Sequence, residues 1–193
     1  MLFNRWKTYL TNSSLVFLVI QNQSNIILET KRLLLREFKL TDAQFLMKLV
    51  KTPGWLEFIG DKKFQSEIDA IEFIQSVLID HYNNHGFGSW LVELKAAKTS
   101  IGLCGLVNRD SLDHVDLGFA LLPEYTKLGY GFEVGKATLE HAQNDLKLDP
   151  IVAITEALNL SSINLLNKLG MKFQQNITLP DDDHVMLFST CLI

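Results

Sequence analysis

The chain has 193 residues, of which 47% are hydrophobic and 21% are charged, enough apolar content for one globular domain with a large core. A formal net charge of −4 without any cluster of Lys and Arg argues against nucleic acid as the main partner and favours a cationic substrate. The two cysteines, Cys104 and Cys191, lie in apolar runs that resemble strands, so we expect reduced thiols, a cytoplasmic setting and no disulfide.

Residues 1–27 carry the basic residues Arg5 and Lys7 ahead of a short apolar run, residues 15–20. This run is shorter than the apolar core of about 7–15 residues in a secretory signal, and far shorter than the roughly 20 residues of a membrane span. We therefore predict an N-terminal extension whose structure the pattern does not specify, no membrane partner, and one domain over residues 28–193.

The first regular pattern is the strand-like run of residues 26–38, which alternates apolar stretches with charges. Thr41 and Gln44 stand in capping-box positions, so a helix is expected to begin there and to end at Pro53 and Gly54.

An aromatic loop is expected next, followed by a long helix capped by Ser66 and ended by Gly86. Four apolar side chains at helical spacing are predicted to share the buried face of that helix: Ile68, Ile71, Ile74 and Leu78.

Three strands with short polar connections follow and are expected to pair as an antiparallel meander: residues 88–95, 100–109 and 114–123. The remaining pattern predicts a helix after a glycine turn, a strand, a short helix and two more strands. One side of the first helix is expected to pack on the sheet through Phe132, Gly135, Leu139, Ala142 and Leu146. The alternation indicates an α/β or α+β domain with helices covering one mixed sheet.

The glycine turn, Gly129 and Gly131, lies directly before the predicted helix. The unpaired N–H groups of a helix start are suited to a phosphate. A dinucleotide-binding turn would need a third glycine where Val134 stands, and no P-loop sequence is present. Both of these phosphate sites are therefore excluded.

The stretch LGFALLPEYTKLGYGFEVGKATLEHA, followed by VAITEALNLSSINLLNKLGMKF, resembles the acetyl-CoA-binding half of the GNAT superfamily of N-acetyltransferases. The upstream segments LETKRLLLREFKLTDAQFL and GSWLVELKAAKTSIGLCGLVNRD are similar to its RimJ/RimL-like branch, the ribosomal-protein N-terminal acetyltransferases. The resemblance spans residues 28–193 and implies a GNAT fold, a mixed and mostly antiparallel central sheet flanked by helices. It also implies acetyl-CoA as co-substrate, a primary amine as acceptor, direct attack in a ternary complex, and no metal.

The resemblance places the pyrophosphate of CoA at the glycine turn, although Thr126 stands where the family's loop begins with Gln or Arg. A loop that binds through backbone N–H groups tolerates this change, at the expense of weaker CoA affinity that Lys127 partly offsets. The residues implied to bind CoA are Phe119, Ala120, Leu121, Leu122, Lys127, Leu128, Gly129, Tyr130, Gly131, Phe132, Asn159 and Ser162. Asn159 is equally suited to a plain helix cap.

Three chemical roles are needed for acetyl transfer to an amine: a base, a polarised carbonyl and a proton donor for the leaving thiolate. The resemblance assigns the proton donor to Ser162, whose alternative role is a helix-start contact. The backbone N–H of Phe119 or Ala120 is expected to polarise the carbonyl. Asp116 and Glu93 are the candidate bases, with Glu57 as a further acidic residue near the amine.

Trp55, Glu57 and Phe58 fall where the family builds its acceptor wall, while the aromatic pair is equally compatible with the core. His81 and His85 have zinc-like spacing, yet no third ligand is evident and a solvent-facing pair is favoured. Cys104 suits a buried packing role better than a nucleophile. A CoA-binding sensor without catalysis and a transferase of a longer acyl group remain as alternatives, and a monomer and a homodimer are both compatible.

Overall fold

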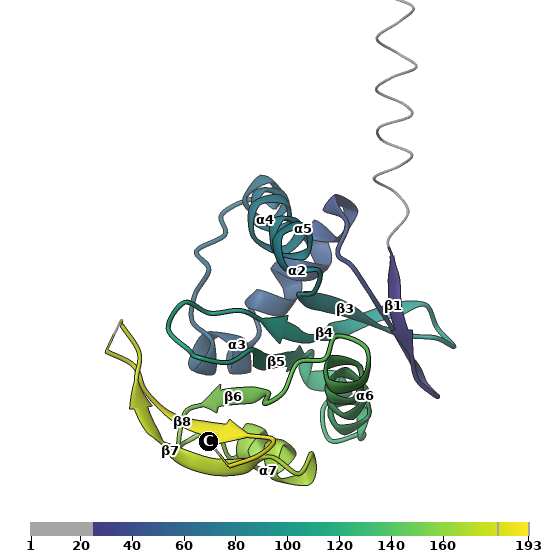
Figure 1. The fold of residues 1–193 in the computed structure, drawn as a ribbon. Coiled ribbons are helices and arrows are strands. Elements are labelled where there is room, and N and C mark those ends of the chain that lie inside the picture. Colours follow the sequence, from purple (N-terminus) through teal and green to yellow (C-terminus); the bar gives the residue numbers. More distant parts are fainter. Residues whose placement is uncertain (1–24, 181, 193) are drawn as a thin grey trace, which may run out of the picture.

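The computed structural model describes residues 25–180 and 182–192, so the expectation for residues 1–24 lies outside the described residues. An eight-stranded sheet has the strand order β1-β2-β3-β4-β5-β6-β8-β7 (Figure 1). β5 (Asp116–Leu121) and β6 (Val152–Thr155) are parallel, whereas the other neighbouring strands are antiparallel. The predicted mixed, mostly antiparallel sheet is therefore confirmed.

Residues 26–38 form a hairpin, so the prediction of one strand is wrong. β1 (Ile26–Glu29) pairs with β2 (Leu33–Arg36). The connection is closed by Thr30, whose N–H donates to the carbonyl of Leu33 at 2.9 Å and whose hydroxyl accepts from the Leu33 N–H at 2.9 Å. A threonine side chain thus stabilises this turn, whereas glycine or proline usually marks a turn in the sequence.

The helix after β2 begins as a short 3₁₀ turn, η1 (Leu40–Asp42), that leads into α2 (Ala43–Val50). Asp42 accepts a hydrogen bond from the Lys39 N–H at 2.7 Å, so the predicted capping box of Thr41 and Gln44 does not form. Asp42 is the better acceptor because its carboxylate is charged and reaches the free N–H directly.

Pro53 begins a helix instead of ending one. α3 (Pro53–Phe58) follows the cap residue Thr52, with proline at its first position, where the missing N–H has no cost. The expected aromatic loop around Trp55 and Phe58 is therefore a helix.

The long helix is confirmed as three consecutive segments: α4 (Glu67–Phe73), the π-helical η2 (Ile74–Ile79) and α5 (Asp80–His85). Ser66 is its N-cap, and Gly86 ends it with φ of 75°. The buried stripe runs through Ala70, Ile74 and Leu78 at i, i+4 spacing. Ile68 lies off this stripe and is 63% exposed, so its predicted burial is wrong.

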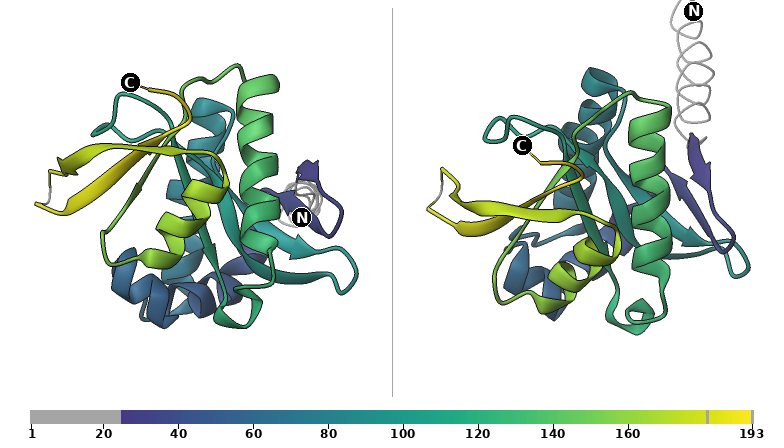
Figure 2. Two further views of the ribbon diagram at one scale, coloured as in Figure 1. Left: turned by 90° about the horizontal axis from the view of Figure 1, so that it is seen from below. Right: turned by 60° about the horizontal axis from the view of Figure 1, so that its bottom comes forward.

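The predicted meander is confirmed by β3 (Ser89–Leu94), β4 (Thr99–Val107) and β5. A 3₁₀ turn, η3 (Pro123–Tyr125), connects β5 to the glycine turn and α6 (Tyr130–Asn144). α6 covers one face of the sheet, where Thr138 lies 3.5 Å from the Cys104 sulfur, and α2 to α5 cover the other face (Figure 2).

Two predicted contacts of α6 differ from the structure. Phe132 is 41% exposed and does not join the buried side of the helix. Gly135 allows close approach to Leu169, the C-cap of α7 (Leu160–Lys168), and not to the sheet, because a Cβ at Gly135 would lie 2.9 Å from Leu169 Cδ1.

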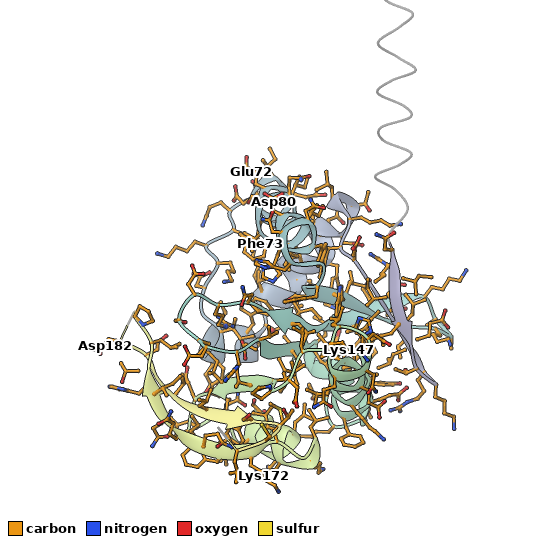
Figure 3. All side chains as sticks on the ribbon, in the orientation of Figure 1. Glu72, Phe73, Asp80, Lys147, Lys172 and Asp182 are labelled. Atoms are coloured by element: carbon orange, nitrogen blue, oxygen red, sulfur yellow. The ribbon has the colours of Figure 1, made fainter. Side chains whose placement is uncertain are left out.

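The chain ends in the antiparallel pair β7 (Lys172–Thr178) and β8 (His184–Ser189). Asp182 lies at the tip of this hairpin, which projects from the body of the domain (Figure 3). Among the helices of residues 25–180 and 182–192, none is long and apolar enough to cross a membrane.

Candidate active site

β5 and β6 meet at one end and then separate. Asp116 is in register with Val152, and the Val152 N–H donates to the carbonyl of Val115 at 2.9 Å. No further pair joins the described parts of these strands, although both continue for several residues. A gap therefore opens between the two strands toward their carboxyl ends, where ligands bind in open α/β sheets.

Backbone alternation decides which groups of β5 face this gap. The Leu122 N–H donates to the carbonyl of Ile101 on β4 at 2.8 Å, so Ala120 also points its N–H toward β4. Phe119 and Leu121 point their N–H and carbonyl groups toward the gap. Of the two backbone groups expected to polarise a carbonyl, Phe119 is thus the one with an available N–H.

The glycine turn forms a cradle of unpaired donors. Within the described residues, the backbone N–H groups of 127–132 donate no hydrogen bond. Lys127 and Gly129 have φ of 59° and 81°, and Gly129 is the N-cap of α6. The helix dipole adds positive potential at the same place, so the turn has the properties of an anion-binding site. Leu128 and Phe132, two more of the residues implied to bind CoA, are exposed beside it.

The Thr126 side chain makes no hydrogen bond to Gly129 or Gly131. Its hydroxyl donates to the carbonyl of Pro123 at 2.8 Å, within the preceding turn η3. Arg32, from the β1–β2 connection, contacts the turn instead, and its Nη1 donates to the carbonyl of Leu128 at 3.1 Å. Sequence reasoning missed Arg32 because 96 residues separate it from Leu128 and no local pattern marks the contact.

The start of α7 lies on the other side of the gap, directly after β6 (Figure 2). Asn159 is its N-cap, and the side-chain Oδ1 accepts from the Ser162 N–H at 3.1 Å and from the Ser161 hydroxyl at 2.9 Å. The capping role of Asn159 is therefore confirmed. The half-buried Ser162 hydroxyl makes no hydrogen bond to any described residue, which leaves it available to a ligand.

The start of α6 packs against the middle of α7. A Cβ added at Gly131 would lie 3.1 Å from Leu165 Cδ2 of α7. This contact places α7 beside the glycine turn.

Asp116 lies where β5 and β6 join and is 2% exposed. One carboxylate oxygen, Oδ2, accepts from Arg109 Nε at 2.7 Å, while Oδ1 has no hydrogen-bond partner among the described residues. Burial raises the pKa of Asp116, and the nearby Arg109 charge and Ile154 N–H lower it only in part. The Ile154 N–H does not form a hydrogen bond with Oδ1. A buried carboxyl with a raised pKa and an unpaired oxygen is suited to proton transfer.

Gly118 leaves space on the same face of β5 as Asp116. Alternation places the side-chain positions of Asp116 and Gly118 on the face opposite α6. A Cβ at Gly118 would meet nothing within 4 Å. The surface of β5 at Gly118 is therefore open on this face.

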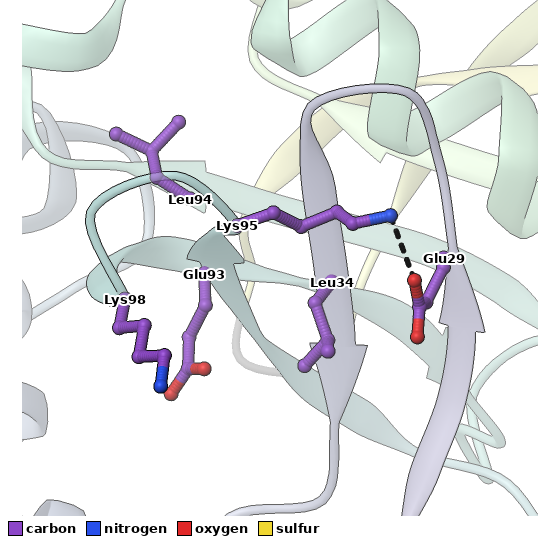
Figure 4. Close-up of a pocket in the computed structure, with 6 residues that line it drawn as sticks. All are labelled: Glu29, Leu34, Glu93, Leu94, Lys95 and Lys98. Carbon is purple, nitrogen blue, oxygen red and sulfur yellow. Dashed lines mark ion pairs between the residues drawn. The ribbon is translucent and has the colours of Figure 1, made fainter.

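Glu93 is not brought together with Asp116. It lies on β3, two strands from β5, and Arg36 binds it through Nη2 at 2.7 Å and Nε at 2.8 Å. Glu93 instead lines a pocket of about 360 Å³ beside β1, β2 and β3, where Lys95 and Glu29 form an ion pair (Figure 4). Because of this position, Glu93 is not placed to take a proton from an amine at the gap between β5 and β6.

The three residues expected at the acceptor wall differ in exposure. Trp55 is part of the hydrophobic core at 6% exposure, and its indole N–H has no partner within the described residues. Phe58 is half-buried and Glu57 is exposed, both on α3.

The remaining candidates form no second catalytic centre. The rings of His81 and His85 lie 4.4 Å apart, and no group of three or more metal-binding side chains occurs in the described parts of the chain. Burial raises the pKa of the Cys104 thiol to about 12, which keeps it protonated and unreactive. Cys191 is exposed after β8, so its expected place in a strand is wrong, and both cysteines are free.

Comparison with known proteins identifies the family. The family model described as an acetyltransferase (GNAT) domain matches residues 32–172, more than half of the chain. The chain belongs to the GNAT acetyltransferases. Its class of activity is accordingly N-acetyl transfer.

Relatives of known sequence or structure agree with this family. The uncharacterized N-acetyltransferase YnaD of Bacillus subtilis is 27% identical over 143 residues, 74% of this chain and 81% of the relative. The structure of RimL, a ribosomal-protein alpha-N-acetyltransferase, in complex with coenzyme A aligns with a TM-score of 0.74 at 14% identity, over 87% of this chain and 98% of RimL. A spermidine N-acetyltransferase from Vibrio cholerae, in complex with CoA and spermine, aligns with a TM-score of 0.67 at 16% identity, over 83% of this chain and 95% of that enzyme.

Proposed function

We propose that this GNAT acetyltransferase uses acetyl-CoA to acetylate a primary amine, a protein N-terminus or a small amine, by direct attack in a ternary complex. The observation that carries the proposal is the combination of a cradle of unpaired N–H groups at residues 127–132 with the gap between β5 and β6. The cradle fits a pyrophosphate, and the gap is lined by backbone groups that fit an extended amide-containing arm.

Acetyl-CoA would supply the acetyl group as a thioester. Residues 127–132 would bind its pyrophosphate, and Phe119 and Leu121 would hydrogen-bond its pantetheine arm as a neighbouring strand does. Leu122 would contribute less than expected, because it is 2% exposed and its N–H is already bound to Ile101.

The chain's own residues would move the protons. Asp116 would accept a proton from the attacking amine, directly or through a water next to Gly118, because its Oδ1 is unpaired and its pKa is raised by burial. The Phe119 N–H would stabilise charge on the carbonyl oxygen. The Ser162 hydroxyl, which is unbound in the described chain, would donate a proton to the departing sulfur.

The acceptor class rests on the relatives. RimL acts on a ribosomal protein and the Vibrio cholerae enzyme on spermidine, and both share this fold. The net charge of −4 favours a cationic acceptor, which both classes provide. We place the chain in the RimJ/RimL-like branch on the four sequence segments above. We also propose a cytoplasmic enzyme, monomeric or homodimeric, that acts without nucleic acid.

The test is thiol release from acetyl-CoA with a panel of peptide N-termini and polyamines. Acetyl-dependent turnover with at least one amine supports the proposal. CoA binding without turnover over the whole panel would favour a CoA sensor, and turnover with longer acyl donors alone would favour a different acyl group.

A further inference from the structure

We propose that Arg32 is a positioning residue for the phosphate-binding turn. It would replace, from a distant part of the chain, the Gln or Arg that this turn lacks at Thr126. The proposal rests on the proposed function, because it assumes that the turn at residues 127–132 binds the pyrophosphate of CoA.

Arg32 contacts three residues of the turn and of the start of α6. Its Nη1 donates to the carbonyl of Leu128 at 3.1 Å. Its guanidinium carbon lies 4.2 Å from the ring centroid of Tyr130, a cation–π contact. Its Nε donates to Oε2 of Glu133 at 2.6 Å. One side chain thus fixes the residues on both sides of Gly129.

Glu133 holds Arg32 in this position. Its Oε1 accepts from the Thr30 hydroxyl at 2.6 Å and from the Arg32 N–H at 2.8 Å, so the β1–β2 connection is bound to the first turn of α6. Burial alone would raise the pKa of Glu133, but the hydrogen bonds from Thr30 and Arg32 outweigh it and lower the pKa. The carboxylate is therefore charged at neutral pH, and the arginine is anchored by charge-assisted hydrogen bonds.

Thr126 cannot perform this function, because its hydroxyl is bound to Pro123. Arg32 also brings positive charge to the turn. Its Nη2 makes no hydrogen bond among the described residues and lies 3.4 Å from where a Cβ of Gly129 would stand. The guanidinium therefore has a free donor beside the N–H groups that face the anion, which favours a doubly charged pyrophosphate.

The decisive experiment compares CoA with pantetheine, which lacks the phosphates, by calorimetry on the full chain. We expect Arg32→Met to weaken CoA binding by about tenfold or more, the loss of a hydrogen-bonded charge, while pantetheine binding is unchanged. The KM for acetyl-CoA should rise with kcat unchanged. Arg32→Lys should restore little of the CoA affinity, because lysine lacks the planar guanidinium that reaches Leu128 and Glu133 together.

Lys95→Met is the matched control. Lys95 also contacts the β1–β2 connection, through the carbonyl of Thr30 at 3.3 Å, and pairs with Glu29 at 2.7 Å, but it does not contact the turn. The Lys95→Met substitution removes the same charge as Arg32→Met and should leave CoA affinity unchanged. In a double-mutant cycle, the losses of CoA-binding free energy caused by Glu133→Gln and by Arg32→Met should be less than additive.

The outcomes separate the two proposals. Unchanged CoA affinity in folded Arg32→Met overturns this inference alone. Equal losses of affinity for CoA and for pantetheine also overturn it, because they indicate general destabilisation of the protein. Failure of the unmodified protein to bind CoA overturns the proposed function as well. If Arg32→Met does not fold, the same comparison is made with Arg32→Lys.

Discussion

Asp116 of β5 and Val152 of β6 form the register pair at which the two parallel strands meet before they separate. The buried carboxyl of Asp116 is therefore located at the closed end of the gap that we assign to acetyl-CoA. Arg109 binds one of its oxygens and leaves the other unpaired. Glu93 differs in place and in burial: it lies on β3, two strands from β5, and 21% of its side chain is exposed, whereas Asp116 is 2% exposed.

Asp116→Asn is expected to lower kcat by about 10²–10⁴-fold, the usual contribution of a positioned base, with CoA affinity retained. Glu93→Gln is the matched control, since it removes the same charge from another strand and should lower the melting temperature without changing kcat per folded molecule. Steady-state kinetics and calorimetry on both variants provide the measurement. Equal loss of kcat in the two variants would refute the choice of Asp116.

The same substitution gives a pH prediction. Burial raises the folded pKa of Asp116 above its ordinary value of 3.8, so the folded state binds this proton more tightly than the unfolded state. The resulting stabilisation is present below pH 3.8 and is lost as the pH rises through the folded pKa. The melting temperature of Asp116→Asn relative to the unmodified protein should therefore increase from about pH 4 upward. A difference that is constant or decreases with pH would contradict the raised pKa.

Sequence patterns predicted the meander, the helix after the glycine turn and the Asn159 cap, because each depends on residues close in the chain. The hairpin of residues 26–38 was missed because Thr30, not glycine or proline, closes its turn. The start of α3 was missed because Pro53 favours a helix start as much as a helix end.

The site was predicted less completely than the fold. The unpaired N–H groups of residues 127–132 follow from a local glycine pattern. The Arg32–Glu133 contact joins residues 101 apart, and the environments of Asp116 and Glu93 depend on Arg109 and Arg36, so only tertiary structure reveals them.

Ser162→Ala is expected to lower kcat by about 10²-fold. This is the low end of the usual contribution of a general acid, because the thiolate of CoA is a tolerable leaving group. The melting temperature should hardly change, since the cap of α7 uses the Ser162 N–H and the hydroxyl is unbound in the described chain. Asn159→Ala is the contrasting variant, with an expected loss of about 1 kcal/mol of stability. Thermal unfolding and kcat on the same preparations test this, and unchanged turnover in Ser162→Ala would remove the serine from the mechanism.

Gly129→Val is expected to weaken CoA binding strongly. Gly129 has φ of 81°, which costs a branched residue roughly 1–3 kcal/mol, and the new side chain would project to within 3.4 Å of Arg32 Nη2. Gly170→Val provides the control, because Gly170 has φ of 87° with no atom near its Cβ position and lies at the end of α7. Both variants should lose stability, while calorimetry should show weakened CoA binding for Gly129→Val alone. Equal CoA affinity in the two variants would refute the assignment of the turn.

Cys104→Ala is expected to leave kcat per folded molecule unchanged, at a loss of roughly 1 kcal/mol of stability from the buried site. Direct attack by the amine requires no acyl-enzyme, and a buried thiol with a pKa of about 12 has almost no thiolate at neutral pH. Peptide mass spectrometry after incubation with acetyl-CoA, without amine, should find no acetyl group on Cys104. Iodoacetamide provides the accessibility control, since it should modify the exposed Cys191 and leave Cys104 intact. An acetylated Cys104 that loses its acetyl group when amine is added would replace direct attack with a two-step transfer.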